Sequence, residues 1–421
     1  MHLSGIGSAN HELSEQDCRQ WVRSLIQSLP LTGKRILIIP PDITRFHSDS
    51  GAITVMLFEE LCSSAPVYVL PATGTHHPMT LSEQQRMFPG IPPQQFLTHD
   101  WKQRVVDLGS ISPEVLAKIS PDAKLGEIRV EANIDLMKQD WDHVISVGQV
   151  VPHEVAGFAS YSKNLVVGLG GQDIINNTHY LSAVSGIERI MGTADNPVRR
   201  LLQYIDDIYL ANLRKTYILI VRGRNDNGAY VTRALFSGNE PTVFQAAAHL
   251  SMSVNVTHLE RPIRKAVVWL DPREYRSTWL GNKAIYRLRC AMADDGELII
   301  LGPGIVQFGE DAKIDALIRQ FGYRGTPRTV KSLAENESLR NSLSAAAHLI
   351  HGSSEGRFRI TYAAGGLSES EIESVGYGYG VLSKLVEQYQ PSLLQTGWHR
   401  DRLGEEFFFV QNPGEGLWKL R

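Results

Sequence analysis

Two histidines, one lysine and five glycines lie within the 33 residues from Gly148 to Tyr180, near the middle of the chain. His153 precedes Lys163 by ten positions, and His179 follows that lysine after sixteen more. Histidine can bind a metal ion or move protons near neutral pH, and a desolvated lysine can act as a nucleophile. Glycine lets the backbone approach a ligand closely. The combination predicts a stretch that holds a cofactor.

Two further polar segments each follow a short apolar run. Asp42-Ile-Thr-Arg45 comes after the run RILIIP, and Thr73-Gly-Thr-His-His77 comes after PVYVL. An arginine fork suits a carboxylate ligand. The plainer alternatives are a helix N-cap with a surface arginine in the first segment and a glycine turn with exposed imidazoles in the second. His99-Asp100, between later elements, is interpreted as a turn cap or a third polar site.

The flanking pattern predicts the elements that position these segments. Strand, polar loop and helix occur twice in succession, which favours an open parallel sheet with ligands beyond the carboxyl ends of its strands. In the first half, helices are expected at 15–29, 52–62, from 80, 196–213 and 242–252, and strands at 35–40, 66–70, 105–108, 127–130, 143–147, 217–221 and 229–235. In the second half, helices are expected at 285–292, 310–321, 332–352 and 380–389, and strands at 265–270, 297–301 and 359–362. The short β-like pieces at 406–410 and 417–420 are expected to pair with each other.

The predicted fold class is therefore α/β, with two domains whose mainly parallel, Rossmann-like sheets are flanked by helices. We expect an N-terminal domain over residues 1–260 that carries the cofactor and the catalytic residues. A C-terminal α/β domain is expected over 261–390, and a C-terminal tail with short strands over 391–421.

The composition of the chain limits its function class. Its 421 residues are 43% apolar and 21% charged, with a net charge of −3, so no basic surface for nucleic acid is indicated. No apolar run has the length of a membrane-spanning helix, and no signal peptide is evident at the start. The three cysteines are widely spaced. We expect a reduced, cytoplasmic setting.

Common catalytic and binding motifs do not account for the central stretch. A glycine-rich backbone such as GLGGQD can cradle phosphate, but this one is neither a Walker A loop nor a GxGxxG in the first strand–helix unit. The chain has no GxSxG, HExxH or CxxC motif. A purely structural role would require a hydrogen-bond partner for each buried polar group.

The ordered set of motifs resembles the nickel-dependent lactate racemase family. The set comprises Asp42-x-Thr-Arg45, Ala72-Thr-Gly-x-His76, Pro152-His153-x-x-Ala-Gly-Phe158, Lys163 and His179. A Lys283-Ala-Ile-Tyr286 stretch leading to Asp295-Gly296 extends the match, so that the resemblance covers about residues 30–305.

The resemblance implies a nickel pincer nucleotide, which is a pyridinium mononucleotide whose sulfur groups bind nickel, covalently attached to Lys163. It implies that His179 is a nickel ligand and that His76 and His153 are the acid/base pair on opposite faces of the substrate. Arg45 and Lys283 would bind the substrate in an interdomain cleft. The remaining cofactor-binding positions are Asp42, Thr44, Thr73 and Gly74.

The activity implied is inversion of the C2 centre of a 2-hydroxy acid by hydride transfer to the cofactor. The family commonly has SGG before the lysine, where this chain has Ala159-Ser-Tyr-Ser162, and often has glutamine at the position of Leu280. We therefore expect a longer or polyhydroxylated acid, such as an aldonate, in place of lactate. The alternatives are a lactate racemase proper, a non-catalytic nickel or pincer-cofactor binding protein, and a metal-dependent hydrolase or lyase. Expected partners are the substrate, cofactor-synthesis proteins for loading and a second copy of the chain.

Overall fold

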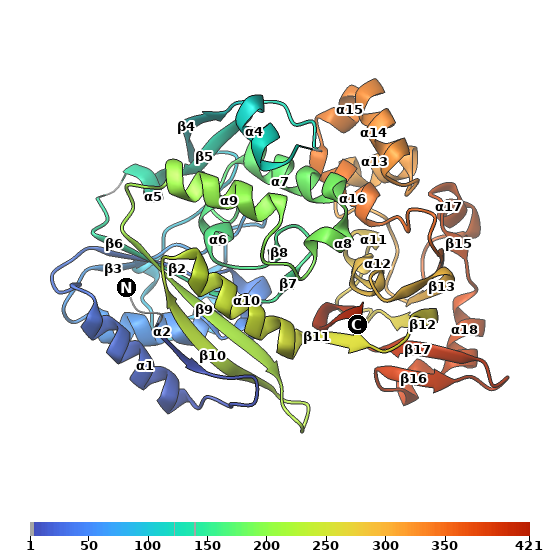
Figure 1. Ribbon diagram of the computed structural model, residues 1–421, viewed down its shortest axis with the longest axis horizontal. Helices are drawn as coiled ribbons and strands as arrows, with labels where there is room; N and C mark the ends of the chain where they lie inside the picture. The colour runs from blue at the N-terminus through green and yellow to red at the C-terminus, as the bar shows by residue number, and fades with distance from the viewer. Residues whose placement is uncertain (1–3, 122, 139) are drawn as a thin grey trace. The chain divides into compact units, whose positions relative to one another are not determined.

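The computed structural model describes residues 4–121, 123–138 and 140–421, which form two compact units (Figure 1). Unit 1 extends to Leu181 and resumes from Arg189 to Asn255. Unit 2 comprises Ser182–Glu188 and Val256–Arg421. Within the described residues, each unit is built on a six-stranded sheet.

The sheet of unit 1 is parallel at its centre and antiparallel at one edge. Its strands, in spatial order, are β1 (Ser4–Gly7), β10 (Tyr230–Gly238), β9 (Lys215–Arg224), β6 (His143–Gln149), β2 (Ile36–Ile39) and β3 (Val67–Val69). Strands β9, β6, β2 and β3 run parallel, whereas β10 and β1 pair antiparallel. All four residues of β2 are buried, as expected for a strand covered on both faces.

Alternate residues of these strands pack against different helices. Ile36 and Ile38 belong to a core with residues of α1 (Glu15–Ser28) and α2 (Ser50–Leu61), and these two helices lie side by side in Figure 1. Because strand side chains alternate, the neighbouring residues face the opposite side, where α10 (Pro241–Asn255) packs on β9 and β10.

The site elements of unit 1 lie between and after these strands. Two antiparallel pairs lie outside the main sheet: β4 (Val105–Ile111) with β5 (Ile128–Asn133), and β7 (Pro152–His153) with β8 (Gly157–Phe158). The remaining helical elements before residue 209 are η1 (Ile43–Ser48), α3 (Leu81–Met87), η2 (Pro93–Gln95), α4 (Pro113–Ile119), α5 (Ile134–Lys138), α6 (Ser162–Val166), α7 (Gln172–Ser185), α8 (Ile187–Ile190) and α9 (Pro197–Ile208). The end of α7 and the start of α8 belong to unit 2.

Unit 2 contains a second, mainly parallel sheet. Its strands, in spatial order, are β15 (Gly378–Tyr379), β14 (Arg359–Ala364), β13 (Met292–Gly302), β12 (Ile263–Trp269), β17 (Glu406–Val410) and β16 (Gly397–Arg400). Only β16 pairs antiparallel within the described part of this sheet. The helical elements are α11 (Thr278–Gly281), α12 (Lys283–Leu288), α13 (Ala312–Phe321), α14 (Thr326–Glu335), α15 (Glu337–Arg340), α16 (Leu343–His351), α17 (Glu369–Ser374), α18 (Leu382–Tyr389), η3 (Pro391–Leu393) and η4 (Pro413–Glu415).

Three local expectations for unit 2 were wrong. The segments 406–410 and 417–420 do not pair with each other: β17 lies beside β12, where Phe407–Val410 are buried, and β18 (Leu417–Leu420) pairs with β11 (Val256–Leu259). The helix expected over 285–292 ends at Leu288, because Met292 already pairs in β13. The stretch 332–352 is divided among α14, α15 and α16, with breaks at Asn336 and Ser342, residue types whose side chains compete with helical hydrogen bonds.

Among the described residues, no helix has the combination of length and apolar character that crossing a bilayer requires.

Candidate functional site

The loop after β2 places a buried carboxylate at the carboxyl end of the sheet. Asp42 is the N-cap of η1, and its Oδ1 accepts hydrogen bonds from the backbone N–H of Thr44 (3.2 Å) and from the Thr44 hydroxyl (2.5 Å). Arg45 follows at a break in this 3₁₀ turn and is exposed. Within the described part of the chain, no carboxylate lies within ion-pair distance of Arg45, which leaves its guanidinium available to a ligand.

The loop after β3 meets the first loop through a histidine. His76 Nδ1 lies 2.7 Å from Asp42 Oδ2, and the His76 side chain is 56% exposed. Burial by itself raises the pKa of Asp42, but the hydrogen bond and charge of His76, together with the Thr44 contacts, hold that pKa below its usual value. A carboxylate on Nδ1 leaves Nε2 of a neutral His76 with its lone pair.

The same loop also contacts the central stretch. The backbone N–H of Gly74, whose φ is +56°, donates to the carbonyl of Gly168 at 2.9 Å. Thr73 is buried, and its hydroxyl has no hydrogen-bond partner among the residues that the structure describes. A buried hydroxyl without a partner is unfavourable, so Thr73 is suited to bind a polar group of a ligand.

The first central histidine lies in a two-strand hairpin formed by β7 and β8. His153 is buried, and its Nδ1 accepts a hydrogen bond from the backbone N–H of Val155 at 3.0 Å. The neutral ring therefore carries its proton on Nε2. Burial lowers the pKa of His153 well below its usual value; Glu154 opposes this shift, and the positive charges of Lys163 and Arg45 add to it.

Lys163 is the second residue of the short helix α6 and is half-buried. Burial lowers the pKa of its amine to about 8, and the charges of Arg45 and Arg199 contribute to the same shift. In residues 4–121, 123–138 and 140–421, no group accepts a hydrogen bond from its Nζ. An amine with a pKa near neutrality and no ion-pair partner is a suitable nucleophile.

His179 lies in α7, where its ring orientation is determined by the helix itself. Its Nδ1 lies 2.6 Å from the carbonyl oxygen of Ile175, one turn earlier. A carbonyl can only accept, so Nδ1 carries the proton and Nε2 has a free lone pair, as in a metal-ligating histidine whose other nitrogen is held by a carbonyl. Burial lowers the pKa of His179, and the charge of Lys163 lowers it further.

Close backbone packing explains the glycines around the lysine. A Cβ atom on Gly168 would lie 2.4 Å from the carbonyl oxygen of Asn164 and 2.7 Å from the Cβ of Ala72. One on Gly171 would lie 2.1 Å from a carboxylate oxygen of Glu131. These glycines let the Thr73 loop and β5 approach the segment that connects α6 and α7.

The predicted residues of unit 1 are thus brought together. Asp42, Thr44 and His76 are in direct contact, and the charges of Arg45, Lys163 and His179 act on His153. Lys283 belongs to unit 2, where it begins α12 next to the buried Asn282 and its Nζ lies 6.0 Å from the ring centroid of Tyr275. The interdomain cleft stays a prediction.

Several residues at this site were not identified from the sequence. Glu154 acts electrostatically on His153, Lys163 and His179, and its position directly after a candidate histidine was the signal that could have identified it. Arg199 is buried against the segment before Lys163. No sequence signal distinguishes it from the exposed Arg200 that follows it.

His99 and Asp100 have local roles. The Nδ1 atom of His99 lies 3.2 Å from the amide nitrogen of Asn133, and the His99 side chain is buried. Asp100 accepts a hydrogen bond from the backbone N–H of Lys102 at 2.9 Å, as a residue that caps a turn does.

The donor set fits the group that the resemblance implies. Lys163 offers an amine for a covalent bond, His179 offers one imidazole lone pair, and Thr73 offers an unpaired hydroxyl. Across the described ranges, no group of three or more His, Cys, Asp or Glu side chains could hold a metal ion.

Comparisons with known proteins agree with this architecture. Residues 20–190 match the family model of the lactate racemase N-terminal domain, and a search of the curated proteins gives no match. A crystal structure of a Thermotoga maritima protein aligns with a TM-score of 0.79 and 22% identity, over 99% of this chain and 100% of the other. The lactate racemase apoprotein from Thermoanaerobacterium thermosaccharolyticum aligns with a TM-score of 0.70 and 18% identity, over 97% of this chain and 94% of the other. The predicted two-domain α/β fold is confirmed.

Proposed function

We propose that this chain, which has a lactate racemase N-terminal domain over residues 20–190, is an isomerase that inverts the C2 centre of a 2-hydroxy acid. One observation carries the proposal. The Asp42–His76 pair, the buried His153 and the half-buried Lys163 lie together in unit 1, with His179 presenting a free nitrogen. A simple ligand-binding protein has no need of two imidazoles and an activated amine in one site.

Lys163 and His179 are proposed to hold a nickel pincer nucleotide. When bound, this group would accept a hydride from the substrate and return it. Lys163 would supply the nitrogen of the covalent bond, because its lowered pKa leaves a useful fraction of neutral amine near pH 8. His179 would ligate nickel through Nε2, with its Nδ1–H held by Ile175. The unpartnered hydroxyl of Thr73 and the backbone of Gly74 would contact the remainder of the nucleotide.

The two acid/base histidines differ in their resting proton positions. His76, with Nδ1 on Asp42, would take the substrate hydroxyl proton at Nε2, and the carboxylate would stabilise the imidazolium that forms. His153 holds its proton on Nε2 because Val155 donates to Nδ1. His153 would therefore begin as a hydrogen-bond donor to the substrate oxygen on the opposite face. To act as a base there, it requires the tautomer with the proton on Nδ1 and a free Nε2.

Arg45 and Lys283 are proposed to bind the substrate carboxylate. Arg45 is exposed and without an ion-pair partner among the described residues, and its planar fork matches a carboxylate. The apolar Leu280, three residues before Lys283, cannot donate or accept a hydrogen bond from its side chain. We propose a 2-hydroxy acid longer than lactate, or a polyhydroxylated acid such as an aldonate, as the substrate.

The test is a substrate screen with protein that has been co-expressed with cofactor-synthesis proteins. Single enantiomers or epimers of lactate, longer 2-hydroxy acids and aldonates are incubated in D₂O, and the C2 configuration is followed by chiral chromatography. We expect inversion of at least one acid without deuterium at C2, because a hydride does not exchange with water. Inversion with full deuterium incorporation would indicate proton abstraction instead. Nickel-loaded protein that inverts no acid would favour a carrier, and hydrolysis of an ester or phosphate panel would favour a hydrolase.

A further inference from the structure

Arg199, in the first turn of α9, is a buried arginine without a carboxylate partner in the described part of the chain. Its Nε donates to the carbonyl of Ala156 at 3.2 Å, and one terminal nitrogen donates to the carbonyls of Phe158 and Ser160, the latter at 3.2 Å. The other terminal nitrogen lies 3.4 Å from the hydroxyl of Ser162. A single guanidinium therefore spans the segment 156–162, which leads directly into Lys163.

This segment has an unusual backbone conformation. Ser160 and Tyr161 are consecutive non-glycine residues with positive φ, at +68° and +58°. Such angles are unfavourable for residues with a Cβ and persist only where surrounding contacts hold them. Both residues lie in the segment where the resembling family has SGG, that is, where glycine would take these angles without strain.

The side chain of Tyr161 also anchors the segment. Its ring is stacked on Phe244 with centroids 5.1 Å apart and lies 4.3 Å from the ring of Tyr217, and its hydroxyl donates to the carbonyl of Asn239 at 2.9 Å. The guanidinium of Arg199 lies 4.2 Å from the same Phe244 ring. Arg199 and Tyr161 thus contact a common aromatic ring, and each holds the strained segment through hydrogen bonds of its own.

We propose that Arg199 is a positioning residue for Lys163: by binding the carbonyls of Ala156, Phe158 and Ser160, it holds the left-handed backbone that directs the lysine amine into the site. This inference rests on the proposed function, in which Lys163 forms the covalent bond. The guanidinium suits the task because its fork of donors reaches several carbonyls at once, which an ammonium group cannot do.

The charge of Arg199 has a second effect on the lysine. Burial is the main cause of the lowered pKa of Lys163, and Arg45 and Arg199 each lower it further. Removing the Arg199 charge should therefore raise the pKa of the amine. A change of one pKa unit from about 8 reduces the neutral fraction at pH 8 by about fivefold.

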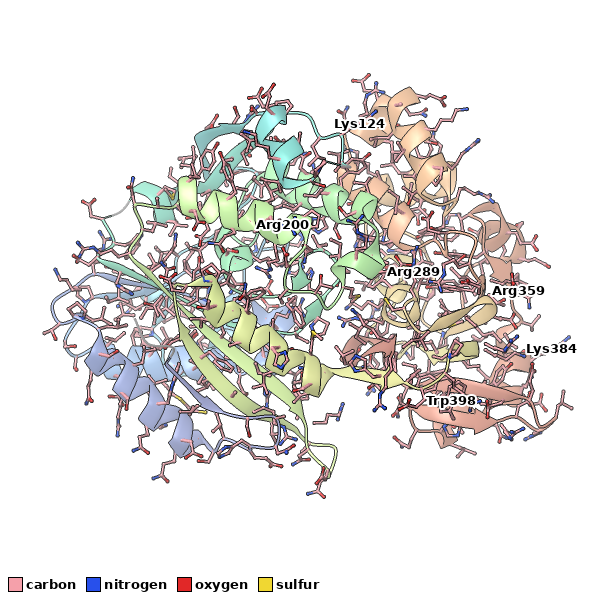
Figure 2. All side chains as sticks on the ribbon, in the orientation of Figure 1. Lys124, Arg200, Arg289, Arg359, Lys384 and Trp398 are labelled. Atoms are coloured by element: carbon pink, nitrogen blue, oxygen red, sulfur yellow. The ribbon has the colours of Figure 1, made fainter. Side chains whose placement is uncertain are left out.

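The experiment compares Arg199→Met and Arg199→Lys with Arg200→Met. Arg200 is the next residue of α9 (Figure 2) but is exposed and pairs with Asp195 at 2.7 Å, so it is a matched control. Protein without cofactor is labelled with acetic anhydride between pH 6 and pH 10. Peptide mass spectrometry then gives the rate at Lys163 relative to the exposed Lys384 (Figure 2). Separately, the cofactor adduct of co-expressed protein is quantified by intact mass.

We expect Arg199→Met to raise the pH midpoint of Lys163 labelling and to reduce its labelling at pH 8, where a midpoint raised by one unit corresponds to a reduction of about fivefold. Arg199→Lys should keep the midpoint near that of the wild type, because the charge remains. Both variants should lose at least about tenfold in adduct occupancy, whereas Arg200→Met should match the wild type in both measurements. If Arg199→Met does not fold, Arg199→Lys still tests the geometry.

Folded Arg199 variants with wild-type labelling and wild-type adduct occupancy would overturn the proposal, even if their melting temperatures fall, since that pattern is expected of a merely structural residue. If wild-type protein itself carries no adduct on Lys163, the proposed function fails. In that case the labelling midpoint of Arg199→Met, which is measured without cofactor, still decides whether the charge of Arg199 acts on the Lys163 amine.

Discussion

His76 Nδ1 lies 2.7 Å from the Asp42 carboxylate, whereas the equivalent nitrogen of His153 accepts a backbone N–H from Val155. The two imidazoles therefore begin with opposite proton arrangements, one with Nε2 free and the other with Nε2 protonated. The Asp42–His76 pair is also partly exposed, while His153 is buried. This asymmetry predicts that the two histidines respond differently to substitution of their neighbours.

Asp42→Asn tests the first histidine. The amide can still cap η1 through its oxygen, but it cannot stabilise an imidazolium at His76, so we expect the inversion rate to fall by roughly a hundredfold or more. Thermal unfolding should change little. Asp195→Asn, at an exposed carboxylate that pairs only with Arg200 among the described contacts, is the control. A wild-type inversion rate in Asp42→Asn would show that the Asp42 carboxylate does not assist proton transfer at His76.

His76→Ala and His153→Ala should each abolish inversion while nickel stays bound, because neither is the proposed metal ligand. The measurements are chiral analysis of the product and nickel per chain by elemental analysis. Loss of nickel from either variant, in protein that still gives the wild-type circular dichroism spectrum, would contradict the role assigned to that histidine.

Lys163→Ala should carry no covalent adduct, and His179→Ala should retain the adduct but lose nickel. The reason is that the amine forms the proposed covalent bond, while the imidazole supplies a metal ligand. Intact mass under denaturing conditions reports the first property, and elemental analysis the second. An adduct mass that persists in Lys163→Ala would show that another residue is the attachment point.

Gly168→Ala should destabilise unit 1 by about 1–3 kcal/mol, the usual effect of inserting a methyl group into closely packed structure. The added Cβ would meet Asn164 and Ala72, pushing the Thr73 loop away from the segment that carries Lys163. Gly126→Ala is the control, because nothing lies within 4 Å of a Cβ at that position. Urea unfolding of both variants gives the comparison; equal midpoints would indicate that the loop adjusts freely.

Stability should fall as the pH decreases from about 7 toward 4. Several histidines have a pKa below the unfolded value of about 6.5, and they are His99 (about 4), His348 (about 3), His143, His153 and His179. A group whose pKa is lowered by folding contributes stability above its unfolded pKa. That stability is lost as the pH falls toward the folded pKa.

The corresponding measurement is urea unfolding between pH 7.5 and pH 4.5. His348→Gln removes one buried imidazole while leaving Tyr323 and Asn282 a polar neighbour. The slope of the unfolding free energy against pH should therefore correspond to about one fewer proton taken up on unfolding. Stability that is constant across this range would refute the assignment of neutral buried histidines.

The sequence predicted the features that depend on local signals. Asp42 and His76 follow neighbouring parallel strands, so their meeting at one sheet edge followed from the strand pattern. The helices expected from residues 15 and 196 begin within one residue of the observed starts of α1 and α9. The position of β17 between β12 and β16 depends on pairing between distant segments, which a period-2 pattern does not specify.

Arg199 shows most clearly what the sequence does not contain. It and Arg200 are adjacent and identical, yet one is buried against carbonyls about 40 positions earlier and the other pairs with a nearby aspartate on the surface. Amphipathic periodicity predicts a helix here but does not identify which arginine is turned inward. Only the tertiary contacts of the segment 156–162 distinguish them.

The left-handed backbone at Ser160 and Tyr161 has a consequence for how related chains are recognised. A sequence motif that requires two glycines before the lysine would miss chains in which larger residues have the same positive φ angles, as Ser160 and Tyr161 do in this chain. In this chain, hydrogen bonds from Arg199 and the packing of Tyr161 hold the backbone angles before Lys163 without a glycine pair.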